Sequence, residues 1–173
     1  MRASIDLHFT VPTDAVVRLV NDVEFIRLKA EHVGSRVVQV DVTAGPDGSF
    51  TSSVRRTIAS DQIPPQVRSF VGTELEIRQT EAWAEPMDGP QGERHGTVSV
   101  EITGAPVRMT GSIRLVPTAE GSVMTYTGDV KSPIPLFGAS IETAAADAIR
   151  SALTEEAAYA AVWLADPSRR GED

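Results

Sequence analysis

The chain has 173 residues, no cysteine and a formal net charge of −8 at pH 7. This length fits one domain of ordinary size, and the absence of cysteine excludes a disulfide framework and a thiolate metal site. Because an acidic protein repels phosphate groups, we expect neither a nucleic-acid partner nor an anionic membrane surface. No apolar run reaches the roughly 20 residues that span a bilayer, and the first residues lack the apolar core of a signal peptide. We therefore expect a cytoplasmic protein with no integral membrane contact, and the sequence leaves its oligomeric state open.

The first elements along the chain are a strand and two short helices. Residues 3–10 alternate apolar and polar side chains, which is typical of a half-buried strand. Thr13 or Asp14 is expected to cap the start of the first helix. The pair Asn21-Asp22 is a second capping signal, and the helix that follows it is expected to end at Gly34.

Six further strands are expected to follow one another. Their apolar and polar side chains alternate in the segments 38–42, 50–58, 75–83, 98–102, 107–115 and 124–130. Pro46-Asp47-Gly48 predicts a tight hairpin between the first two, and Gly111 predicts a bend or bulge. Such an order favours an antiparallel hairpin sheet. The connection 61–72 is expected to hold one helical turn or a lid-like loop, in which Phe70 and Val71 either cover a cavity or pack under the loop.

One long helix is expected near the end of the chain. From about residue 139 to residue 165 nothing breaks a helix, and alanine, the best helix former, is frequent. The helix would be about 40 Å long. Its apolar stripe comprises Ile141, Ala145, Ala148, Ile149, Ala152, Tyr159, Val162 and Trp163. We expect one domain over residues 1–166 and a disordered polar tail over residues 167–173.

The order of one strand, two short helices, six strands and a long C-terminal helix resembles the START-like (SRPBCC, helix-grip) superfamily, which includes birch-pollen-allergen-like proteins and polyketide cyclases. The resemblance covers roughly residues 3–165. Several local strings are also similar to a domain-of-unknown-function family within that superfamily: Arg55-Arg56-Thr57, Phe70-Val71-Gly72-Thr73-Glu74-Leu75, Gln79-Thr80-Glu81-Ala82-Trp83, Gly104-Ala105-Pro106-Val107 and Ser132-Pro133-Ile134-Pro135-Leu136.

This resemblance implies an α+β helix-grip fold with a seven-stranded curved antiparallel sheet. Two short helices would follow the first strand, and the long C-terminal helix would lie over the concave face. A cavity between sheet and helix would hold a hydrophobic molecule. Fold alone does not fix function, so the residues themselves must supply the rest of the argument.

Small side chains in the middle of the long helix support a cavity. Ala144, Ala145, Ala148 and Ala152 leave room between helix and sheet, beside Ile149. The alternative is that these alanines only allow the helix and the sheet to pack closely.

Polar side chains share the inward face of two strands with apolar ones. Arg56 alternates with apolar residues on one strand, and Gln79, Glu81 and Trp83 lie on one face of the next. Because an unpaired buried charge costs several kcal/mol, we expect Arg56 to meet Glu81. This pair would either hold two strands in register or anchor the head group of an apolar ligand.

Other titratable groups give weaker indications. Tyr126 is expected either to offer its hydroxyl to a ligand or to lie in the core with its tip at the rim. Glu155 and Glu156 interrupt the helix stripe, and we expect them to be solvated, with the alternative that one of the two leans inward. No pair of histidines has metal-ligand spacing, so we expect no metal site.

We therefore expect the chain to bind a hydrophobic small molecule, lipid-, polyketide- or isoprenoid-like, without catalysis and without a cofactor. The candidate ligand-binding residues are Arg56, Gln79, Glu81, Trp83, Tyr126, Ala145, Ala148, Ile149 and Ala152. The alternative is a polyketide cyclase- or aromatase-like enzyme, in which Arg56 stabilises an enolate and Glu81 transfers a proton, with Tyr126 as a further candidate. A protein-interaction domain is a third class, which no sequence feature favours.

Overall fold

The structure is a computed structural model that describes the chain except for residues 60, 62, 64, 69–72, 106 and 167–173. The expectations for Phe70 and Val71 and for the polar tail lie outside the described residues.

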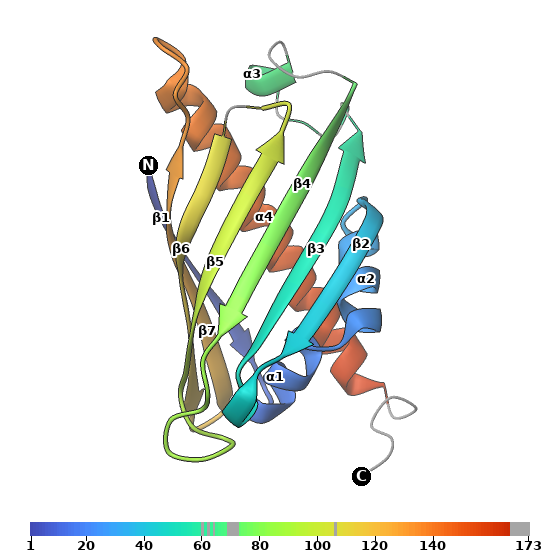
Figure 1. Ribbon diagram of the computed structural model, residues 1–173, viewed down its shortest axis with the longest axis vertical. Helices are drawn as coiled ribbons and strands as arrows, with labels where there is room; N and C mark the ends of the chain where they lie inside the picture. Colours follow the sequence, from blue (N-terminus) through green and yellow to red (C-terminus); the bar gives the residue numbers. More distant parts are fainter. Residues whose placement is uncertain (60, 62, 64, 69–72, 106, 167–173) are drawn as a thin grey trace.

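The elements follow the predicted order (Figure 1). They are β1 (Arg2–Phe9), α1 (Thr13–Val20), α2 (Val23–His32), β2 (Arg36–Ala44), the 3-10 turn η1 (Pro46–Gly48), β3 (Phe50–Ala59), α3 (Pro65–Arg68), β4 (Glu74–Trp83), β5 (Arg94–Thr103), β6 (Val107–Thr118), β7 (Gly121–Lys131) and α4 (Gly138–Ala165). The strands form one seven-stranded sheet in the order β1-β7-β6-β5-β4-β3-β2, and all neighbours are antiparallel. The α+β helix-grip fold is therefore confirmed, with α4 lying across one face of the curved sheet (Figure 1).

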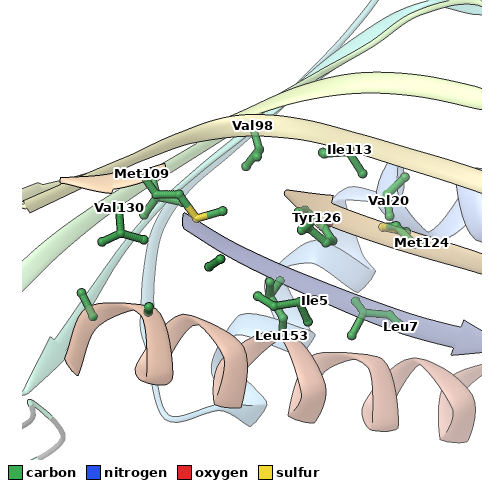
Figure 2. Close-up of a cluster of buried hydrophobic side chains, with 14 of the residues drawn as sticks. Ile5, Leu7, Val20, Val98, Met109, Ile113, Met124, Tyr126, Val130 and Leu153 are labelled. Carbon is green, nitrogen blue, oxygen red and sulfur yellow. The ribbon is translucent and has the colours of Figure 1, made fainter. Parts of the chain in front are cut away.

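The inner face of the sheet is largely apolar because burial alternates along most of the strands, β2 at the edge of the sheet being without a buried residue. On β1, Ala3, Ile5 and Leu7 are buried while the residues between them are exposed. Across the sheet, Ile5 lies opposite Tyr126, which lies opposite Ile113. Figure 2 shows these side chains in the space between the strands and α4, which contributes Leu153.

Two glycines face each other on β6 and β7. Gly111 lies opposite Gly128 in the register. A Cβ at Gly111 would lie 2.1 Å from the carbonyl oxygen of Thr127, and one at Gly128 would lie 2.6 Å from the methyl carbon of Met109. At Gly111 only glycine fits, because the clash there is with backbone atoms. The predicted alternative of a bulge at Gly111 is wrong, since the register of β6 runs unbroken through this residue on both sides.

The helix starts were predicted in part. Asp22 caps α2, because its Oδ1 accepts hydrogen bonds from the backbone N–H groups of Glu24 and Phe25. The prediction that Thr13 or Asp14 caps α1 is wrong, since Pro12 is the capping residue and no side chain takes part.

The C-terminal end of α4 is packed by aromatic rings. Phe25 of α2 stacks on Tyr159 with ring centroids 6.1 Å apart and meets Trp163 edge-on at 5.3 Å. Val162, which the predicted stripe included, is 69% exposed and takes no part in this cluster. The reason is helical geometry: Tyr159 and Trp163 are four residues apart and share a face, whereas Val162 is rotated away from Trp163.

Candidate ligand-binding cavity

A cavity of about 320 Å³ lies between the inner face of the sheet and α4. Apolar side chains from β3, β4, β5, β6 and α4 form most of its wall, among them Ile77, Val100, Ile102, Met109 and Ile141. Apolar pockets that hold small molecules have about 300–1,000 Å³, so this cavity is at the small end of that range.

Most of the predicted candidates surround this cavity. Arg56, Gln79 and Tyr126 line it from the sheet, and Ala145, Ala148, Ile149 and Ala152 line it from α4. Glu81 and Trp83 are buried but do not line it. Glu81 instead lines a smaller cavity of about 20 Å³, together with Arg56 and Gln79.

The cavity exists because α4 presents small side chains where the sheet curves away. Ala145 is buried and faces the space, while Ala148 and Ser151 line it and are also exposed. Glu155, which is also exposed, lines the cavity one turn further along α4. The cavity therefore reaches the surface along one stripe of α4.

Arg56 forms a buried ion network with α4 and α2. Its Nη1 donates to Glu156 Oε1 at 3.0 Å, and Lys29 Nζ lies 2.9 Å from Glu156 Oε2. Glu156 is 5% exposed. Burial alone would raise the pKa of Glu156, but the Lys29 ammonium and the Arg56 guanidinium outweigh it, so the pKa lies below its ordinary value. Glu156 therefore stays ionised between two cations.

Two expectations about these charges are wrong. Arg56 does not meet Glu81, because the register places Arg56 opposite Ile77 and Glu81 opposite Ser52. Four residues along a strand separate the two charged side chains, so Arg56 takes its partner from α4 instead. Glu156 is also not solvated. It lies four residues from Ala152 and three from Tyr159, a helical spacing that could have placed it on the buried face.

Lys29 is a member of the buried ion network that the sequence reasoning missed. It lies on α2 four residues after Phe25 and next to Ala30, both of which are buried. This periodicity places Lys29 beside the inward face of α2, and its side chain is 14% exposed.

Glu81 is held by three neutral donors. Gln79 Nε2 donates to its Oε1 at 2.9 Å, Tyr126 Oη donates to the same oxygen at 3.0 Å, and Trp83 Nε1 donates to Oε2 at 3.1 Å. Burial raises the pKa of Tyr126 well above its ordinary value, and the nearby Glu81 carboxylate raises it further. The phenol therefore keeps its proton and donates it in a hydrogen bond to Glu81.

This arrangement bears on the cyclase alternative. A proton-transfer role for Glu81 requires its carboxylate to reach a molecule in the large cavity. Glu81 does not line that cavity, and its two oxygens already accept the hydrogen bonds of Gln79, Trp83 and Tyr126.

Arg56 retains donors that the described residues do not use. Its Nη1 donates to Glu156, its Nε is fully buried without a partner, and its Nη2 makes no hydrogen bond to another described residue. A buried, unpaired donor of this kind costs about 1–3 kcal/mol, and more when it is charged. The guanidinium thus lies at the wall of an apolar cavity with capacity to bind an acceptor.

Two further observations concern other classes of site. Among the residues that the structure describes, no three His, Cys, Asp or Glu side chains gather so that they could hold a metal ion. No described helix combines the length and the apolar character that crossing a bilayer requires.

The comparisons with known proteins agree with this architecture. The model of a family described as "Protein of unknown function (DUF2505)" matches residues 4–164. No protein of the curated set matches the chain.

Solved structures share the fold at low sequence identity. The protein TTHA0849 from Thermus thermophilus is 15% identical with a TM-score of 0.56, over 96% of this chain and 99% of that one. A protein from Rhodobacter sphaeroides is 13% identical with a TM-score of 0.57, over 95% and 91%. Human STARD10 is 10% identical with a TM-score of 0.54, over 91% of this chain and 61% of that one. These likenesses show a START-like fold and confirm the predicted resemblance.

Proposed function

Because the chain belongs to the DUF2505 family of proteins of unknown function, its function has to be argued from its own site, and we propose that it binds a hydrophobic small molecule between the sheet and α4. The binding is non-enzymatic, and the molecule enters along the α4 stripe that contains Ala148. The observation that carries this proposal is a largely apolar cavity of about 320 Å³ with an incompletely paired arginine in its wall.

The physical argument is one of surface removed from water. An apolar molecule that enters the cavity removes its own surface and that of the wall from water. This burial contributes a favourable free energy of about 25 cal/mol per Å² of apolar surface. The START-like fold supports the proposal because it supplies a concave sheet that one helix closes, and apolar pockets with few polar groups are the usual form of small-molecule sites.

The test is a titration of delipidated protein with the neutral fluorescent probe N-phenyl-1-naphthylamine. We expect saturable binding at about one probe per chain. Ala148→Phe places a ring in the cavity lining and should weaken binding at least about tenfold, whereas Ala158→Phe, on an exposed position of the same helix, should bind like the wild type.

Both variants must first give the wild-type circular dichroism spectrum, so that a loss of binding reports the site and not the fold. The proposal fails if the wild type does not bind the probe. It also fails if Ala148→Phe and Ala158→Phe bind the probe equally well.

A further inference from the structure

We infer that the ligand is a compact, uncharged molecule whose single oxygen acceptor, in a ketone, ester or alcohol, is bound by Arg56. This inference rests on the proposed function and adds the size and the head-group chemistry of the ligand.

The size follows from the cavity. An apolar cavity of about 150 Å³ holds one benzene ring, and this cavity has about 320 Å³. It therefore has room for roughly 10–20 non-hydrogen atoms, as in one medium-length chain or a small ring system. A lipid with two long acyl chains is too large.

The need for an acceptor follows from the use of donors in the wall. Gln79 Nε2 and the Tyr126 hydroxyl both donate to Glu81, so they are already engaged. Arg56 uses Nη1 for Glu156, and its Nε is buried too deeply for a ligand atom to reach, which leaves Nη2, a donor with no hydrogen bond to a described residue. A guanidinium offers five N–H donors and accepts none, so the complementary ligand atom is an acceptor oxygen.

The absence of ligand charge follows from the balance of the buried groups. The charged groups around the smaller cavity of about 20 Å³ are two cations, Arg56 and Lys29, and two carboxylates, Glu156 and Glu81. The four formal charges sum to zero, and the additional carboxylate of Glu155 lies at the exposed edge of the cavity. A ligand anion would bring a buried negative charge with no cation left to balance it, and such a charge is costly. A ketone, ester or alcohol accepts the hydrogen bond without this cost.

The test compares ten-carbon ligands that differ only in the head group. Each displaces N-phenyl-1-naphthylamine from the wild-type protein at pH 7: 2-decanone, 1-decanol, decanoate and decylammonium. We expect the ketone and the alcohol to bind at least about tenfold more tightly than decanoate and decylammonium. Vesicles of dioleoylphosphatidylcholine should not displace the probe beyond the loss that its partition into the vesicles, measured without protein, accounts for.

Arg56→Met and Arg55→Met form a matched pair for the role of the guanidinium. Arg55 is the next residue on β3, its side chain alternates to the other face, and it does not line the cavity. Arg56→Met should weaken 2-decanone binding about tenfold more than it weakens binding of the probe, which has no oxygen. Arg55→Met should change neither. If Arg56→Met does not fold, Arg56→Lys takes its place in this test. It keeps a cation beside Glu156 and should also weaken ketone binding.

Several results would overturn the inference while leaving the proposed function intact. These are probe binding with decanoate as the tightest ligand, ketone affinity that neither Arg56 variant changes, or displacement by the phospholipid. Failure of the wild type to bind the probe at all would instead reject the proposed function.

Discussion

The two ends of the space between the sheet and α4 differ in how they are packed. At one end, which we call the filled end, Leu7, Leu115 and Met124 lie opposite one another on β1, β6 and β7, and α1 adds Val16. At the other end, the hollow end, the wall includes Ala105, Ala145 and Ala148 and encloses the cavity of about 320 Å³. Figure 2 shows side chains of both ends, with Met124 and Leu7 at one side and Met109 and Val130 at the other.

This difference indicates which end stabilises the fold and which end is available to a ligand. The space left at the filled end is about 30 Å³, against about 320 Å³ at the hollow end. The closer packing of the filled end is therefore expected to carry more of the stability of the fold. The hollow end is packed less closely, and its apolar wall remains free to contact a ligand. Between the two lies the buried network of Lys29, Glu156 and Arg56, which ties α2, α4 and β3 together.

The largest expected effect comes from breaking this network. Glu156→Gln leaves Lys29 and Arg56 buried without their carboxylate, and the loss of one partner of a buried ion pair costs about 3–5 kcal/mol of unfolding free energy. Urea denaturation measures this loss. The control Glu155→Gln, at an exposed neighbouring position, should stay within about 0.5 kcal/mol of the wild type. Equal stability of the two variants would show that the network does not stabilise the fold.

The next effect concerns the buried hydrogen bonds around Glu81. Tyr126→Phe removes the hydrogen bond from the phenol to the buried carboxylate of Glu81 and should cost about 1.5–3 kcal/mol. The measurement is again urea denaturation. A stability equal to that of the wild type would contradict a buried Glu81 side chain that depends on this donor.

Substitutions at two neighbouring alanines of α4 test directly whether the hollow space differs from the packed core. Ala146 is 1% exposed and does not line the cavity, whereas Ala145 lines it. Ala146→Leu should therefore overpack the core and cost about 1–3 kcal/mol, while Ala145→Leu should cost less than about 1 kcal/mol or stabilise the protein. Thermal and urea denaturation of the two variants measure the difference. A greater loss in Ala145→Leu would mean that the space beside Ala145 is already filled.

The smallest effect is a dependence on pH. The pKa of Glu156 is lower in the folded protein than its ordinary value of 4.5. The stabilisation that this group provides is therefore fully present well above pH 4.5 and is lost as the pH falls through the folded-state value. At pH 4 the loss from this group is at most about 1 kcal/mol, because it is limited by protonation of the unfolded chain. Glu156→Gln should lose correspondingly less stability between pH 6 and pH 4 than the wild type, and a steeper loss in the variant would contradict this assignment.

The sequence predicted the fold because its signals are local. Alternation of side chains marks the strands, and an unbroken alanine-rich segment marks α4. The partner of Arg56 was not predictable in this way. The register of β3 against β4 depends on the long connection between them, and it separates Arg56 from Glu81.

The site was predictable only where periodicity alone places a residue. Ala145, Ala148 and Ala152 follow from the helical stripe, and the same spacing includes Glu156 once its charge is set aside. Lys29 was overlooked for the same reason, because a charged residue is not expected on the inward side of α2. Whether a buried charge is tolerated depends on partners that tertiary packing supplies, and Glu156 lies 100 positions from Arg56 in the sequence.

The most direct test of a hollow end that binds a ligand uses the four methionines as reporters. Met109 lines the cavity, Met124 lies in the filled end, and Met1 and Met87 are exposed. Protein labelled with ¹³C at the methionine methyl groups gives one NMR signal for each, which single Met→Leu variants assign. On titration with 2-decanone, we expect the Met109 signal to shift with saturation at one ligand per chain while the Met124 signal stays in place. An unchanged Met109 signal, or an equal shift at Met124, would contradict the account.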